Sequence, residues 1–405
     1  MAPYGDAPGP AQRVDFPHHT VRQGEDPGLE SHYPPACLSV PRRAGGERPL
    51  MSRSTGLEQF HAQDRCDPLL WSLLPMGIWM AALSGSVAVD SVPVAVILSI
   101  IGGVAGSQLF VIGHDACHGS LTASRLLNAL IGRMAFVPSA HSFSLWAYFH
   151  NGLHHNFTNL RGHDFVWTPL SPDEFSHLSK VRQFMECIYR HPTGAGIGLY
   201  YAIELWRRRL AWPTRIVPRR VAPSAYADVA TTVTTWLLVG GTTAFLCELE
   251  IGQFLGGTAL FAGVSLVIIT WAIGFVVYFN HTHPRLKWYG CAAQWREEFS
   301  QEAGACHVTF RGIWWYVLPN VVMNHTLHHL DTRIPARHLA DAETHLESAT
   351  GTRLLSWRWT PVRHYAVMKR CGLYDYAEGR WVSLDWKRIG EGRKHAPKCK
   401  TAVNS

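Results

Sequence analysis

The sequence predicts an all-α integral membrane protein, with four transmembrane helices in two hairpins and a cytosolic, histidine-rich helical cap. Three observations lead to this fold class. Four uncharged apolar runs are long, the two runs of each pair are joined by a short connection, and histidines cluster beside the runs. An α-helix rises about 1.5 Å per residue, so roughly 20 apolar residues cross the ~30 Å hydrocarbon core of a bilayer.

The first pair of runs is Leu69–Val89 and Val92–Ile112. The connection around Asp90 is short and lacks Lys and Arg, which places it on the non-cytoplasmic side. Gly102 and Gly106 are four residues apart in the second run, and such small-residue pairs are typical of helices that pack closely in membranes. We therefore expect this helix to lie against a neighbour.

The second pair of runs is Val229–Cys247 and Gln253–Phe279. The densest basic cluster of the chain precedes it and comprises Arg207, Arg208, Arg209, Arg215, Arg219 and Arg220. Lys and Arg accumulate on the cytoplasmic flank of membrane segments, so this flank is predicted to be cytosolic. Both hairpins then begin and end on the same side, and all histidine clusters face the cytosol.

Composition and charge divide the rest of the chain. Residues 1–66 are predicted to be a disordered cytosolic extension, residues 67–385 the membrane domain and residues 386–405 a basic tail. The net charge is +7, but no nucleic-acid-binding signature occurs and the basic residues gather beside apolar runs, so nucleic acid is excluded as a partner. Nine scattered cysteines without a Cys-x-x-Cys pair indicate reduced thiols rather than disulfides or a zinc ribbon.

The histidines form boxes with helical spacing. The first box is His114-x3-His118, the second is His150-x3-His154-His155, the third is His325-x2-His328-His329, and His281 follows the fourth run. Residues three or four apart share one helical face, as metal binding requires, whereas adjacent residues point about 100° apart and can serve two different metals. A catalytic zinc usually takes three protein ligands, so this many imidazoles suit two metal ions, which the ligand type leaves open among Fe, Zn, Cu and Ni.

Longer motifs around these boxes carry a family resemblance. They are His114-Asp-Ala-Cys-His-Gly-Ser120, Gly162-His-Asp-Phe-Val-Trp-Thr168, Asn280-His-Thr-His-Pro284 and Asn324-His-Thr-Leu-His-His-Leu-Asp-Thr-Arg-Ile-Pro335. From about Leu69 to Thr350 the chain resembles the membrane fatty acid desaturases, closest to the Δ12/ω-6 and ω-3 acyl branch. The second box departs from that branch, which usually has two residues before the His pair. Here three residues follow His150, and Asn151 stands at the usual position.

The resemblance implies an oxidoreductase of lipid metabolism. By this resemblance it would be an O2-dependent desaturase that introduces a double bond, Δ12/ω-6-like, into an acyl chain held on a membrane lipid or a thioester. Two irons would be bound and catalysis carried out by His114, His118, His150, His154, His155, His281, His325, His328 and His329. Three polar residues, Asp115, Asp164 and Asn324, are expected to support these ligands by hydrogen bonds, and four aromatic residues, Trp146, Phe149, Trp167 and Trp315, to line an acyl tunnel.

Several alternatives remain open from the sequence. A hydroxylase, acetylenase, conjugase or carotenoid oxygenase would use the same boxes. A membrane zinc hydrolase would normally show His-Glu-x-x-His, and a metal carrier would place ionisable residues inside the spans; neither pattern occurs. The chain shows no His-Pro-Gly-Gly of a cytochrome b5 domain and no iron–sulfur cysteine pattern, so a separate donor of the ferredoxin or cytochrome b5 type is expected to supply electrons.

Overall fold

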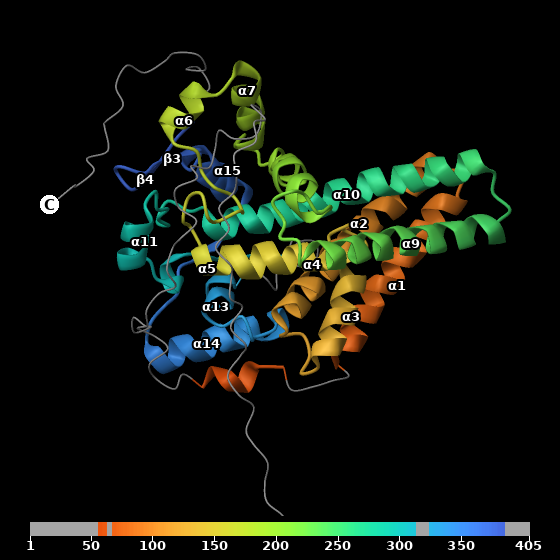
Figure 1. The fold of residues 1–405 in the computed structure, drawn as a ribbon, viewed down its shortest axis with the longest axis horizontal. Coiled ribbons are helices and arrows are strands. Elements are labelled where there is room, and N and C mark those ends of the chain that lie inside the picture. The colour runs from red at the N-terminus through yellow and green to blue at the C-terminus, as the bar shows by residue number, and fades with distance from the viewer. Residues whose placement is uncertain (1–55, 63–66, 313–323, 385–405) are drawn as a thin grey trace, which may run out of the picture. The chain divides into compact units, whose positions relative to one another are not determined.

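Four long apolar helices dominate the structure, a computed structural model that describes residues 56–62, 67–312 and 324–384 (Figure 1). They are α1 (Asp67–Ala88), α2 (Val92–His118), α9 (Ala222–Leu246) and α10 (Ile251–His281). Each is long and apolar enough to cross a membrane, and the four helices contain the four predicted runs, apart from Val89 and Cys247, as candidate spans. α2 and α10 run past the apolar segments and end at histidines, so the two longest helices deliver ligand-type side chains to one place.

Shorter helices make up most of the remaining described structure. They are η2 (Leu57–Phe60), α3 (Arg125–Phe136), α4 (Phe143–Trp146), η3 (Ala147–His154), α5 (His155–Phe157), α6 (Pro172–His177), α7 (Lys180–Tyr189), α8 (Ile197–Tyr200), η4 (Tyr201–Leu210), α11 (Ala292–Glu298), η5 (Gln301–Ala303), α13 (His325–Leu330), η7 (Ala336–His338), α14 (Leu339–Thr350) and α15 (Pro361–Arg370). Of these, η3 and η4 are π-helices, and η2, η5 and η7 are 3₁₀-helices. η2 lies within the extension predicted to be disordered, and its Leu57 is buried in the core that includes α14.

Two small sheets make the fold mostly helical rather than all-α. β1 (His307–Thr309) pairs in parallel with β2 (Ser356–Arg358), and β3 (Leu373–Asp375) pairs antiparallel with β4 (Arg380–Val382). Each strand has three residues, too few for the alternation of apolar and polar residues that marks a strand in a sequence. The sheets were therefore not visible in the pattern of residues.

Small residues set the approach of α2 to α10. A Cβ on Gly102 would lie 2.5 Å from Phe261, and a Cβ on Gly106 would lie 2.6 Å from Ile269, both residues of α10. Only glycine leaves room for these side chains, so the expected close packing is present. α2 also packs along α1, and it is therefore held on two sides before it reaches the histidines.

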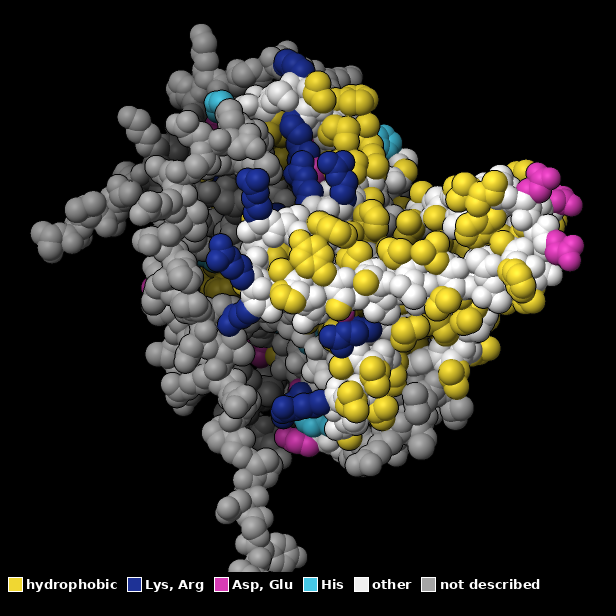
Figure 2. Space-filling model, turned by 45° about the vertical axis from the view of Figure 1, so that its right-hand side comes forward, with side chains coloured by type: hydrophobic (Ala, Val, Ile, Leu, Met, Phe, Trp, Pro, Cys, Tyr) yellow, Lys and Arg dark blue, Asp and Glu magenta, His cyan; other side chains and the backbone are white. Residues whose placement is uncertain are grey.

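The surface of the four helices is apolar. Leu73, Leu74, Ile97, Leu237 and Val267 are more than half exposed, and Figure 2 shows such side chains covering this part of the molecule. Because a water-soluble surface rarely leaves so many large apolar side chains exposed together, this region fits the interior of a bilayer. The chain is an integral membrane protein.

Polar residues mark the ends of these helices. The connection between α1 and α2 meets the start of α10, where Nε2 of Gln253 donates to Oδ1 of Asp90 over 2.9 Å. Figure 2 shows acidic side chains at this tip and Lys and Arg side chains toward the other end of the helices. The histidines lie at that other end, since they end α2 and α10.

Candidate metal centre

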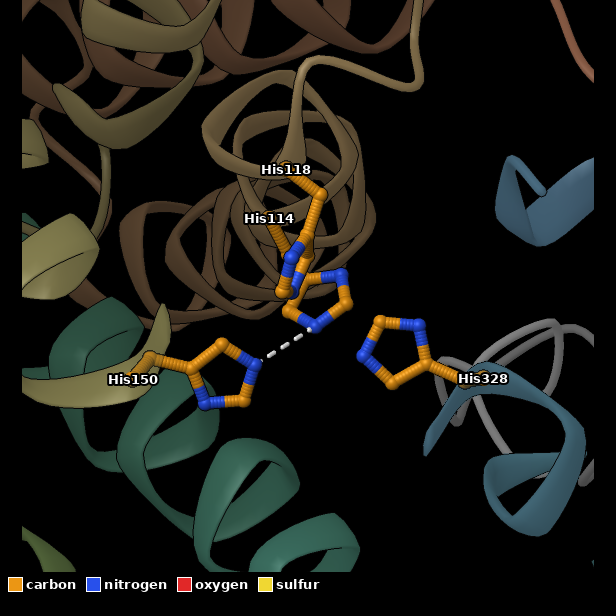
Figure 3. Close-up of side chains that lie close together, drawn as sticks. All are labelled: His114, His118, His150 and His328. Carbon is orange, nitrogen blue, oxygen red and sulfur yellow. Dashed lines mark hydrogen bonds between the residues drawn. The ribbon is translucent and has the colours of Figure 1, made fainter. Parts of the chain in front are cut away.

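Four histidines from three elements form a first cluster: His114, His118, His150 and His328. Each residue offers one ring nitrogen, and these four nitrogens all lie within 4.8 Å of one another. Figure 3 shows the rings turned toward a common point. α2 supplies His118 from its last turn and His114 from the turn before it, and Gly119 follows the helix at φ 72°, a conformation that favours glycine. η3 supplies His150, and α13 supplies His328.

A second cluster lies beside the first and comprises His154, His281, His325 and His329. All four are buried, and their ligand atoms also lie within 4.8 Å of one another. Nε2 of His325 is 3.0 Å from Nε2 of His281 and 3.2 Å from Nε2 of His329. The fourth spanning helix and the second and third boxes therefore meet here, as the sequence predicts.

His155 adjoins the first cluster. Its Nε2 lies 3.1 Å from Nε2 of His150 and 3.1 Å from Nε2 of His328. Its ring also stacks on His329 of the second cluster, with 4.3 Å between the centroids. The structure thus brings all nine predicted histidines together, in two adjacent groups.

The hydrogen bonds of two imidazoles show which ring nitrogen carries the proton and which carries the lone pair that can bind a metal. Nδ1–H of His281 donates to the carbonyl oxygen of Gly304 over 3.0 Å, and Nδ1–H of His154 donates to Oδ1 of Asp164 over 2.9 Å. A neutral imidazole has one N–H, so Nε2 of each of these rings carries a lone pair. In the second cluster the lone pair on Nε2 of His281 faces Nε2 of His325 at 3.0 Å. A cation bound between two such nitrogens would stabilise this arrangement.

Burial keeps the imidazoles in the form that binds metal. It lowers the pKa of His150, His155, His328 and His329 well below the ordinary range, and repulsion from neighbouring imidazoles lowers it further. These rings are therefore neutral near pH 7, as a metal ligand must be. The Nε2 atom of His118 is buried and has no hydrogen-bond partner in the described part of the chain. A donor set of neutral imidazoles fits a transition-metal ion such as iron.

The three polar residues predicted to support the ligands make different hydrogen bonds. Asp164 holds His154, and its other oxygen accepts the backbone N–H of Asn159 over 2.8 Å. Asp115 lies 3.2 Å from Nδ1 of His114, and its other oxygen accepts the N–H of Ala336 over 2.6 Å.

Asn324 reaches a neighbouring network instead. Its amide donates to Glu343 over 2.7 Å and lies 3.3 Å from Nδ1 of His307, directly before His325 begins α13. Two partners of the imidazoles were missed by the sequence analysis. They are the Gly304 carbonyl and Thr158, whose Oγ1 lies 3.3 Å from Nδ1 of His329. A backbone carbonyl carries no sequence signal, and a lone threonine carries a weak one.

An apolar cavity reaches both clusters. Phe110, Val111, Trp146, Val166, Ile273, Val276 and Val277 line it together with five histidines, namely His114, His150, His154, His281 and His325. Trp146 lies on this wall and stacks on His150 at 4.6 Å between centroids. Phe149 packs on Phe165, and Trp167 packs between Tyr200 and Tyr278, so neither lines the cavity. Trp315 lies outside the described residues.

Comparison with known proteins gives a consistent result. The sequence model of the family described as "Fatty acid desaturase" matches residues 91–361. The chain is 26% identical over 278 residues to "Omega-6 fatty acid desaturase, chloroplastic" of Arabidopsis thaliana, covering 68% of this chain and 58% of the relative. It is 25% identical over 344 residues to "sn-1 oleoyl-lipid 12-desaturase" of a Picosynechococcus strain, covering 83% and 95%. It is 27% identical over 252 residues to "Omega-3 fatty acid desaturase, endoplasmic reticulum" of Vigna radiata, covering 60% and 62%.

Proposed function

This chain belongs to the fatty acid desaturase family, and we propose that it introduces a double bond into a fatty acyl chain, Δ12/ω-6-like, with O2 and a histidine-bound pair of irons. The apolar cavity carries this proposal. Seven apolar residues line it, which suits a hydrocarbon segment, and imidazoles of both clusters lie on its wall. Relatives named as an omega-6 fatty acid desaturase and as an oleoyl-lipid 12-desaturase support the same substrate class.

In this proposal the first iron is held by His114, His118, His150, His155 and His328, and the second by His154, His281, His325 and His329. A pair of irons bound there would supply, together with O2, an oxidant able to remove two hydrogen atoms from an unactivated carbon–carbon segment. Reducing O2 to two waters takes four electrons, of which the substrate gives two. The other two come from a donor.

The chain's own residues bind and orient. Trp146 and Phe110 form apolar wall beside the imidazoles, which excludes water and keeps the acyl segment against them. Asp164 and the Gly304 carbonyl hold His154 and His281 in the tautomer that turns Nε2 toward the metal. A rigid ligand set of this kind needs little reorganisation during turnover.

We place the histidine clusters on the cytosolic side, with two helical hairpins in the bilayer. The support is the exposed arginines before α9, of which Arg207, Arg215 and Arg219 are examples, and the acidic connections at the far tip (Figure 2). Two exposed cysteines allow a test, since Cys247 ends α9 and Cys291 precedes α11. In single-cysteine variants, an impermeant thiol reagent applied to intact cells should label Cys247 only. Labelling of Cys291 alone would reverse the orientation.

A separate acidic electron carrier is the proposed donor, of the ferredoxin or cytochrome b5 type. Arg220 lies near η3, where burial raises the pKa of Tyr148 and the arginine's positive charge opposes this rise. The basic flank therefore lies beside the helix that carries the second box, and it would attract an acidic protein. Turnover with such a carrier should fall as salt concentration rises. Turnover of the purified protein on NAD(P)H alone would contradict a separate donor.

The decisive experiment is a product assay. Cells or proteoliposomes that contain the protein, a donor system and an oleoyl lipid should yield a new double bond by gas chromatography–mass spectrometry. The His325→Ala variant serves as the inactive control. A hydroxylated product without a new double bond would replace the desaturase by a hydroxylase of the same fold. A chain that binds one zinc and no iron would remove the oxidase class altogether.

A further inference from the structure

The second and third boxes differ in the spacing of their histidines, but each divides its three histidines between the two clusters in the same pattern. In the third box, on α13, two residues separate His325 from His328. In the second box three residues separate His150 from His154. Each box sends its outer two histidines to one cluster and its middle histidine to the other. His325 and His329 lie in the second cluster with His328 in the first, whereas His150 and His155 lie at the first cluster with His154 in the second.

The type of helix accounts for this equivalence. The outer histidines of the third box are four residues apart, which is about one turn of an α-helix, and their Nε2 atoms are 3.2 Å apart. The outer histidines of the second box are five residues apart, which on an α-helix would turn them about 140° from each other. The box lies on the π-helix η3, where hydrogen bonds join residues five apart, and the N–H of His155 donates to the carbonyl of His150. Their Nε2 atoms are consequently 3.1 Å apart.

Two asparagines fasten this π-turn. Nδ2 of Asn151 donates to the carbonyl of Cys117 over 2.8 Å, which ties the turn to the residue before His118. Nδ2 of Asn156 donates to the carbonyls of Asn151 and Gly152, over 3.1 and 2.9 Å. These two asparagine side chains thus donate to backbone carbonyls in the last turn of α2 and within η3. Gly152 faces open space, because a Cβ built on it would meet nothing within 4 Å.

We propose that the π-turn of η3 is the device that absorbs one extra residue in the second box and places His150 one helical turn from His155, so that both reach the first metal. Gly152 is then dispensable as a residue of the turn. Removing it leaves two residues between His150 and His154, the spacing of the third box, on an ordinary α-helical turn. This inference rests on the proposed two-metal function.

The test compares three variants of the full-length protein purified in detergent. Deletion of Gly152 should retain the wild-type iron content of two per chain, because an α-turn restores the spacing of one helical turn. Insertion of one alanine after Gly152 should lower the iron content below two, because no regular turn then places His150 at the first site and His154 at the second, so the two sites do not both keep their full ligand sets. Gly152→Ala is the matched control and should behave as wild type. Thermal unfolding of the same samples gives a second readout, with the deletion melting near wild type and the insertion lower.

The outcomes separate the two ideas. A wild-type protein with two irons, together with a deletion variant that falls to the level of the insertion, would overturn the role of the π-turn and leave the function standing. A wild-type protein without iron would contradict the proposed function instead. In that case the melting temperatures decide the inference: it stands if the deletion melts with the wild type, and it fails if the deletion melts with the insertion.

Discussion

The two histidine clusters offer similar donors but differ in how firmly these are oriented. In the second cluster, Asp164, Gly304 and Thr158 lie within hydrogen-bond distance of three imidazoles, and all four rings are buried. In the first cluster, Nε2 of His118 and Nδ1 of His150 have no hydrogen-bond partner among the described residues. The residues His118 and His155 are also only partly buried. The difference indicates a tightly preorganised second site and a looser, more accessible first site.

The largest expected effect is the loss of a ligand. His281→Ala and His118→Ala should each reduce turnover by more than the ~100-fold typical of losing a ligand's hydrogen-bond partner. Iron analysis should separate them. His281→Ala leaves three imidazoles at the second site and should retain about one iron, whereas His118→Ala leaves four at the first and should purify with nearly two. The reverse order would contradict the comparison.

Removal of an orienting carboxylate should have the next largest effect. Asp164→Asn preserves shape but turns an amide donor toward N–H groups, and it should weaken iron binding at the second site about 10- to 100-fold. Asp115→Asn is the matched variant at the first site and should weaken binding less, because Asp115 lies 3.2 Å from His114. Competition against a calibrated chelator measures both. Equal effects would mean that the two sites are equally dependent on their carboxylates.

A third measurement addresses accessibility. A water-soluble chelator should remove iron in two phases, with the first site emptying first because His118 and His155 are only partly buried. Asp164→Asn assigns the phases, since it should accelerate the slow one and leave the fast one unchanged. Iron-57 Mössbauer spectra taken during the release follow each site. Release in a single phase would show that the clusters exchange metal as a unit.

The smallest expected effect comes from Thr158. Its hydroxyl donates to the carbonyl of His154 over 2.7 Å and lies 3.3 Å from Nδ1 of His329. Thr158→Val removes both contacts at nearly constant volume. A neutral hydrogen bond contributes roughly 0.5–1.5 kcal/mol, so iron affinity at the second site should fall about two- to tenfold. Thr168→Val, at a hydroxyl that bonds the carbonyl of Asp164, is a control expected to change affinity less.

Much of the architecture follows from local patterns. The four spans are visible because a bilayer demands a long uncharged apolar run, whatever the rest of the chain does. The boxes are visible because ligands on one helical face must recur at three or four residues. Local pattern does not reveal the three-residue strands. The pairing of β1 with β2, for example, joins residues about 50 positions apart in the chain. Local pattern also does not distinguish Trp146, which lines the cavity, from Phe149 and Trp167, which lie near the boxes in sequence but are not among the residues that line it.

The sequence by itself determined which side chains are available as ligands and that they meet at one end of the membrane helices. Only the tertiary structure decided how they divide, with His154 in one cluster and its neighbour His155 beside the other. The physical reason is that the direction of an imidazole depends on the type of helix that carries it and on remote contacts. The π-turn of η3 sets the directions of His150, His154 and His155, and the Gly304 carbonyl, 23 residues along the chain from His281, sets the direction of that ring. Neither can be read from the spacing of the histidines.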